Sequence, residues 1–72
     1  MGFRELQGEA IKMRTSGKTL EEIRAYLFKA ATALGGVITD VDLPPGGFEI
    51  RHTVSGQRIR YTEAGGFSYY PS

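Results

Sequence analysis

The sequence contains no cysteine and a single histidine, His52, among its 72 residues. Without cysteine, neither a disulfide nor a thiolate metal site can stabilise the fold, and one histidine cannot build a zinc site alone. No apolar run approaches the ~20 residues that a membrane-spanning helix needs. The charged residues Arg4, Glu5 and Glu9 make the N-terminus unlike a signal peptide. We therefore expect a cytoplasmic protein, since the lack of cysteine fits a reducing compartment.

The chain also lacks an excess of charge of one sign. Nine basic and eight acidic residues leave a formal net charge of +1. A nucleic-acid-binding protein that relies on its overall charge is usually far more basic. If this chain binds an anion, it must do so through a local patch.

What is present is a change of hydrophobic period near Gly35-Gly36. Apolar residues recur at helical spacing before this pair, and they alternate after it in short runs separated by turn residues. The pattern predicts a single α+β domain over residues 1–72. In this fold two N-terminal helices pack on one face of a three- to four-stranded antiparallel β-meander.

The first helix is expected over about residues 2–14, where Phe3, Leu6, Ala10 and Met13 share one face. The second is expected over about 19–34. There Thr19 and Glu22 have the spacing of a capping box, and Gly35-Gly36 follows as a stop. The apolar stripe of the second helix comprises Leu20, Ile23, Leu27, Ala30, Ala31 and Leu34. Phe28 lies off this stripe, so it either meets the first helix or is exposed.

Strands are expected over about residues 37–43, 48–54, 57–62 and 67–70. In the first, Val37, Val41 and Leu43 would face the core, with Asp40 and Asp42 outside. In the next two, the residues predicted to point inward are Phe48, Ile50, His52, Val54, Ile59 and Tyr61. Ser55-Gly56 is short enough for a two-residue hairpin turn with positive φ at Gly56.

This turn predicts a register in which Arg51 lies opposite Arg60 and Thr53 opposite Arg58. Arg51, Arg58 and Arg60 would then share one sheet face, beside Asp40, Asp42 and Glu49. Like charges directly opposite one another are unfavourable. Either the carboxylates neutralise the arginines on a solvated face, or the arginines form a phosphate or carboxylate site, which guanidinium groups suit.

No catalytic arrangement is recognised in the sequence. His52 is predicted to be a structural residue at the end or rim of the core, because no serine or carboxylate is obviously placed beside it. Gly17-Lys18-Thr19 resembles the end of a phosphate-binding loop, but the upstream glycine is missing. We expect no enzymatic activity, no metal and no cofactor.

The last six residues contain three aromatic residues, Phe67, Tyr69 and Tyr70. These either complete the core or form a partner-binding surface, because tyrosine is enriched at interfaces.

The expected function is that of a small non-enzymatic interaction protein that docks on a larger protein. It would be an accessory factor or inhibitor of the kind carried by phages and mobile elements, masking a site on its partner. The candidate partner-binding residues are Arg51, Arg58, Arg60, Tyr69, Tyr70 and Phe28. One alternative is a nucleic-acid-binding module that uses the arginine face. A second is a structural subunit that self-associates through its C-terminal edge strand.

Overall fold

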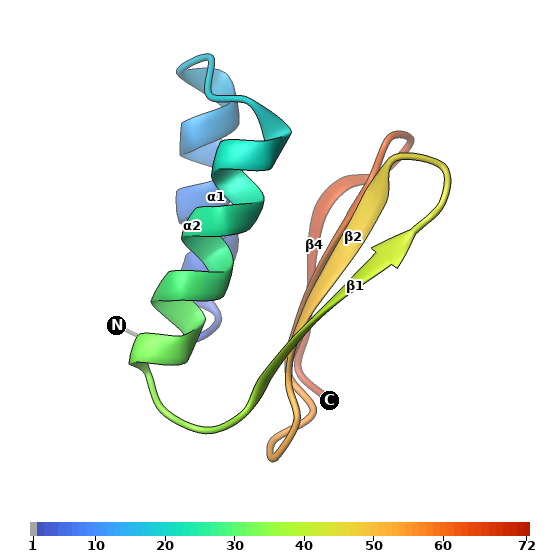
Figure 1. Ribbon diagram of the computed structural model, residues 1–72. Coiled ribbons are helices and arrows are strands. Elements are labelled where there is room, and N and C mark those ends of the chain that lie inside the picture. Colours follow the sequence, from blue (N-terminus) through green and yellow to red (C-terminus); the bar gives the residue numbers. More distant parts are fainter. Residues whose placement is uncertain (1) are drawn as a thin grey trace.

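A computed structural model describes residues 2–72, which form two helices followed by four strands (Figure 1). The helices are α1 (Glu5–Thr15) and α2 (Leu20–Ala33). The strands are β1 (Ile38–Leu43), β2 (Gly47–His52), β3 (Arg58–Thr62) and β4 (Gly66–Tyr70). The sheet is an antiparallel meander in the order β1-β2-β3-β4, and both helices lie on one of its faces (Figure 1). The predicted α+β architecture is confirmed, including the fourth strand.

Helix α1 begins three residues later than predicted, because Gly2 and Phe3 belong to a preceding turn. The Glu5 side chain accepts a hydrogen bond from the Gly2 backbone amide in this turn. Phe3 is nevertheless buried, together with Leu6 and Ala10. The apolar face predicted for this helix therefore does reach the core.

Helix α2 begins with the predicted capping box. The Thr19 hydroxyl accepts from Glu22 N at 3.1 Å, and the Glu22 carboxylate accepts from Thr19 N at 3.0 Å. The helix ends before Gly35, whose φ of 96° suits glycine. Leu34, expected on the buried stripe, lies instead at the helix end and is 43% exposed. Neither helix, within the described residues, has the length and apolar character needed to cross a membrane.

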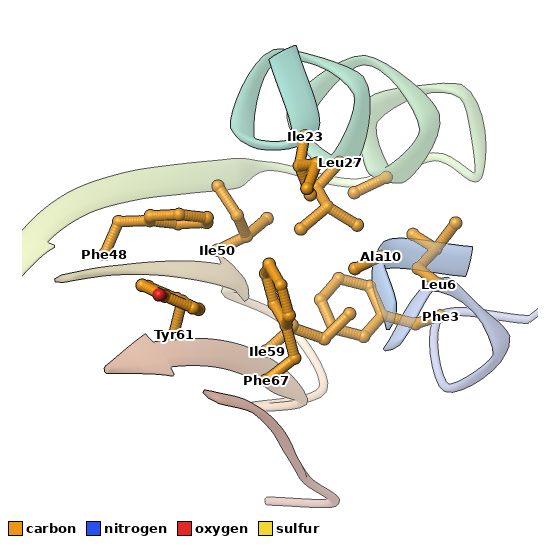
Figure 2. Packing of buried hydrophobic residues seen from close by; sticks show 11 residues of the cluster. Phe3, Leu6, Ala10, Ile23, Leu27, Phe48, Ile50, Ile59, Tyr61 and Phe67 are labelled. Carbon is orange, nitrogen blue, oxygen red and sulfur yellow. The ribbon is translucent and has the colours of Figure 1, made fainter. Parts of the chain in front are cut away.

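The core lies between the two helices and the inner face of the sheet (Figure 2). Helix α1 packs against β4, and α2 packs against β1 and β2. Three rings from neighbouring strands, Phe48, Tyr61 and Phe67, have centroids 4.8–6.2 Å apart. Phe67 is thus a core residue, as one of the two interpretations predicted. The buried apolar residues are Phe3, Leu6, Ala10, Ile23, Leu27, Ala31, Phe48, Ile50, Ile59, Tyr61 and Phe67.

The predicted orientation of β1 is wrong, because its register on β2 differs by one residue. Leu43 pairs with Gly47 rather than Phe48, so Asp40 lies opposite Ile50 and Val41 opposite Glu49. A shift of one residue turns every side chain of a strand to the other face. Val41 is accordingly 49% exposed on the side away from the helices.

Asp40 and Asp42 therefore face α2. The sequence pattern had predicted that they would lie beside the arginines, and that prediction is wrong. Arg24 of α2 forms ion pairs with both carboxylates. Its Nη2 atom lies 2.8 Å from Asp40 Oδ1 and 2.7 Å from Asp42 Oδ1. The hydrogen bond to Asp40 is the main cause that raises the pKa of Arg24. The Arg24 guanidinium also lies over the Phe48 ring, 5.1 Å from its centroid. These contacts hold α2 against the edge strand β1.

The β2–β3 connection is longer than the predicted two-residue turn. His52 N donates to Gln57 O, and Gly56 N donates to His52 O, so residues 53–56 form the turn. The φ of Gly56 is 78°, which confirms the predicted positive value. Val54, predicted to point inward, lies in this turn and is 80% exposed.

The register of β2 and β3 consequently differs by two residues from the predicted one. Arg51 pairs with Arg58, Glu49 with Arg60 and Ile50 with Ile59. Because a shift of two residues keeps every side chain on its face, the residues of β2 and β3 face inward and outward as predicted, and Val54 is the exception because it lies beyond β2.

Candidate functional site

The sheet has one face that carries no helix, and we call it the outer face. The strand register arranges its side chains in rows across the sheet. The first row contains Thr39, Arg51, Arg58 and Tyr70. The second contains Val41, Glu49, Arg60 and Ser68. Beyond them lie Leu43, Gly47, Thr62 and Gly66.

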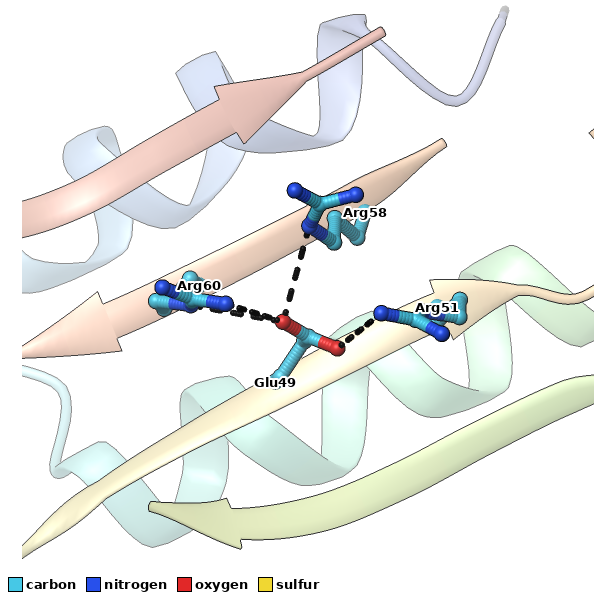
Figure 3. A network of polar contacts seen from close by, with 4 residues as sticks. All are labelled: Glu49, Arg51, Arg58 and Arg60. Carbon is cyan, nitrogen blue, oxygen red and sulfur yellow. Dashed lines mark hydrogen bonds and ion pairs between the residues drawn. The ribbon is translucent and has the colours of Figure 1, made fainter. Parts of the chain in front are cut away.

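Three of the predicted partner-binding residues, Arg51, Arg58 and Arg60, lie together on this face, and we call them the arginine cluster (Figure 3). Their side chains are 46%, 27% and 37% exposed, respectively. The cluster combines residues of two central strands, so the backbone beneath it is hydrogen-bonded on both sides.

Glu49 occupies the centre of the arginine cluster (Figure 3). Its side chain is only 8% exposed. Arg60 Nη2 donates to Glu49 Oε2 at 2.9 Å, and Arg60 Nε donates to the same oxygen at 3.3 Å. Arg51 Nη2 lies 3.3 Å from Oε1, and Arg58 Nε lies 3.7 Å from Oε2. One buried carboxylate therefore holds three guanidinium groups that would otherwise repel one another.

The balance of charge at this site is positive. Three guanidinium groups against one carboxylate leave a local net charge of 3 − 1 = +2. Among residues 2–72, only Arg60 makes hydrogen bonds to Glu49 of normal geometry, and Arg58 Nε has no hydrogen-bond acceptor. Because Arg58 Nε is buried, a further anion would reach the other N–H groups of Arg58 and those of the more exposed Arg51.

Tyr70 of β4 supports the cluster from the side. The Arg58 and Arg60 Cζ atoms lie 4.8 Å and 5.3 Å from the centroid of its ring. Such cation–π contacts restrict the guanidinium groups while leaving their edges free for hydrogen bonds. Tyr70 therefore restricts Arg58 and Arg60, whereas Arg51 is held only by its contact with Glu49.

The structure does not bring the other two predicted binding residues to this site. Tyr69 points to the opposite face, where it packs against the core and its hydroxyl donates to Gln57 Oε1 at 2.7 Å. Phe28 lies on α2, on the other side of the sheet, and is 39% exposed. Of the predicted residues, only Tyr70 joins the three arginines, because adjacent residues of a strand point to opposite faces.

The sequence pattern included Glu49 among the carboxylates expected to neutralise the arginines, and its contacts with all three confirm that interpretation. The alternation of β2 did place Glu49 on the arginine side, and that signal was available. The burial of Glu49 could not be predicted, because Glu49 is covered by the three arginine side chains. These come from two strands whose register the sequence does not reveal.

The polar network at His52 was also missed. Ser55 Oγ lies 2.7 Å from His52 Nδ1, although no serine had been expected beside this ring. His52 Nε2 lies 3.2 Å from Gly35 O, which can only accept, so Nε2 carries the proton and Nδ1 accepts from the Ser55 hydroxyl. Ser55 Oγ in turn accepts from Gln57 N and Nε2. The network joins the β2–β3 turn to the end of α2, and it supports the prediction of a structural histidine at the core rim.

The residues described, 2–72, contain no group of three or more histidine, aspartate or glutamate side chains that could hold a metal ion. No protein-family model matches the chain, and no curated protein or solved structure shows significant similarity to it.

Proposed function

We propose that this chain is a small non-enzymatic interaction protein that docks on a larger protein through the outer face of its sheet. The single observation that supports the proposal is the arginine cluster. Buried Glu49 contacts all three guanidinium groups and Tyr70 contacts two of them, and the cluster keeps a net charge of +2 on a face that no helix covers. A surface prepared in this way loses little side-chain entropy when it binds an acidic partner.

The composition of the outer face favours a protein partner. Arginine and tyrosine are enriched among the residues that dominate binding energy at protein interfaces. Val41, 49% exposed, lies directly opposite Glu49 and adds apolar area beside the charges.

Occupation of a partner's acidic surface would mask that surface. We therefore propose the role of an accessory factor or inhibitor, of the kind that phages and mobile elements encode. We also propose a cytoplasmic location, with which the lack of cysteine is compatible.

Nucleic-acid binding is the second candidate, and the same three arginines favour it. Phosphate binding weakens steeply with added salt because counterions are released. A contact that also buries Val41 and Tyr70 should depend less on salt. Self-association through β4 has less support, because Gln7 of α1 already donates to Phe67 O of this strand at 3.0 Å.

The test is affinity capture from the source cells with tagged protein in three forms. The parent is compared with the double variant Arg51→Gln/Arg58→Gln, which keeps the hydrogen bonds between Arg60 and Glu49. The control is Lys12→Gln/Lys29→Gln, which removes the same charge from exposed helix positions. We expect the parent and the control to retain the same protein and the arginine variant to lose it. Equal capture by all three forms would contradict the proposal, and capture abolished by nuclease would favour the second candidate.

A further inference from the structure

A groove of about 420 Å³ lies at one end of the outer face. It is bounded by the β1–β2 turn and the β3–β4 turn, which lie at the same end of the sheet (Figure 1). Its apolar lining is provided by Leu43, Pro44, Pro45 and Ala64. We call it the end groove.

Gly47 and Gly66 lie on the outer face in this region and place no side chain there. A Cβ atom at Gly47 would collide with the carbonyl oxygen of Tyr61 and lie 3.0 Å from that of Leu43. Glycine is thus required for strand packing at this position, beside the groove residue Leu43.

The end groove is continuous with the arginine cluster, because Arg60 lines the groove and also donates to Glu49. Side chains two residues apart on one strand are about 6.6 Å apart. Along β3, Thr62 at the groove, Arg60 and Arg58 therefore form a series with this spacing. A ligand of about five extended residues would span the groove and both arginine rows.

The charges along this series differ from what a nucleic acid requires. Glu63 lines the end groove, so an evenly charged phosphate backbone would meet a carboxylate there. A neutral apolar side chain avoids that repulsion, while carboxylates further along the same ligand meet the surplus charge of the cluster. The surface is therefore complementary to a ligand with an apolar end and an acidic end.

We propose that the outer face binds an acidic peptide segment of the partner, with one bulky apolar side chain in the end groove and carboxylates at the arginine cluster. This inference rests on the proposed function and specifies the chemistry of the partner. In an extended segment the acidic residues lie two and four positions from the apolar one, on the same side of the peptide.

The test is an NMR titration of the ¹⁵N-labelled full chain with short synthetic peptides. The probe is acetyl-Leu-Ser-Glu-Ser-Glu-amide, together with the same residues in reverse order. One control peptide has serine in place of leucine, and another has glutamine in place of both glutamates. A single-stranded oligothymidylate of similar length represents nucleic acid.

We expect one of the two leucine peptides to bind about fivefold more tightly than the serine control and about tenfold more tightly than the glutamine control. Shift changes should include Leu43, Arg60 and Ala64. In the variant Leu43→Ser the advantage of leucine over serine should disappear. It should persist in Val54→Ser, an apolar-to-serine change in the turn at the other end of the sheet. Ala64→Gln, which fills the groove from an exposed turn, is a second variant should Leu43→Ser not fold.

The outcomes separate the two proposals. Equal affinity for the leucine and serine peptides would overturn the role of the end groove and leave the arginine face as the docking surface. Tighter binding of the oligothymidylate than of every peptide would overturn both. Absence of any shift with all probes would overturn the peptide inference, whereas the capture experiment with the arginine variant decides the proposed function separately.

Discussion

Glu49 and Arg60 are paired across β2 and β3, and Arg60 Nη2 lies 2.9 Å from Glu49 Oε2. The carboxylate is buried, whereas the guanidinium is 37% exposed. Removal of Arg60 and removal of Glu49 should therefore destabilise the fold by different amounts. Without Arg60 the carboxylate keeps only the longer contacts to Arg51 and Arg58, while an arginine that loses Glu49 can still reach water.

This asymmetry predicts that Arg60→Gln destabilises the fold more than Arg51→Gln. We expect a loss of about 1–3 kcal/mol for Arg60→Gln, the cost of a buried charged group that loses its hydrogen bonds. Arg51→Gln removes one exposed contact of 3.3 Å and should cost less than about 1 kcal/mol. Urea denaturation of the two variants measures both values. Equal losses would show that Arg60 has no special role.

A second prediction concerns the core between α2 and the sheet. Leu27 is fully buried, so Leu27→Ala should cost about 2–5 kcal/mol. A loss of this size is a large part of the stability of a domain of this length, so the variant should be largely unfolded at 37 °C. The neighbouring Phe28 is 39% exposed, and Phe28→Ala should cost much less. Similar melting temperatures for the two variants would contradict the placement of α2.

Two glycines are expected to respond oppositely to alanine. Gly47→Ala places a Cβ against the carbonyl oxygen of Tyr61 and should destabilise by about 1–3 kcal/mol. Gly8 lies in α1, where an added Cβ atom would meet no other atom within 4 Å, so Gly8→Ala should stabilise by up to about 1 kcal/mol. Thermal unfolding of both variants checks the signs. If Gly8→Ala destabilised the fold, the open surroundings of Gly8 in α1 would be contradicted.

The capping box of α2 predicts a dependence of stability on pH. The backbone amide of Thr19, followed by its hydroxyl group, lowers the pKa of Glu22 below its ordinary value of 4.5. A lowered carboxyl pKa stabilises the fold above the unfolded-state value, and this contribution is lost as the pH falls through the folded-state value. The melting temperature of the parent should therefore exceed that of Glu22→Gln at pH 7, and the difference should shrink below about pH 4.5. The adjacent Glu21→Gln, which makes no capping hydrogen bond, is the control. A difference that stays constant with pH would rule out this role for the carboxylate.

Local signals in the sequence predicted the helices and the number of strands well. The capping box, the stripe through Ile23 and Leu27, and the glycine stop all act within a few residues of each other. The turns were less predictable, because their length depends on backbone contacts between strands. Gly47 belongs to β2 in the structure, whereas the pattern had assigned it to the turn. This difference of one residue places the opposite face of β1 toward the helices, and Asp40 therefore contacts Arg24.

The grouping of the three arginines was predicted correctly although the predicted β2–β3 register was wrong. The β2–β3 register differed from the predicted one by two residues, and an even shift keeps Arg51, Arg58 and Arg60 on one face. The end groove could not be predicted, since it depends on two turns that come together only in the folded sheet.

The central claim is that the arginine cluster is the docking surface. The most direct test is the dissociation constant of the purified, captured partner for the parent, for Arg51→Gln/Arg58→Gln and for Lys12→Gln/Lys29→Gln, with equal melting temperatures confirmed beforehand. A loss of about tenfold or more, ~1.4 kcal/mol, is expected for the arginine variant alone, well within what two charge-assisted contacts supply. A folded arginine variant that binds as tightly as the parent would contradict the account.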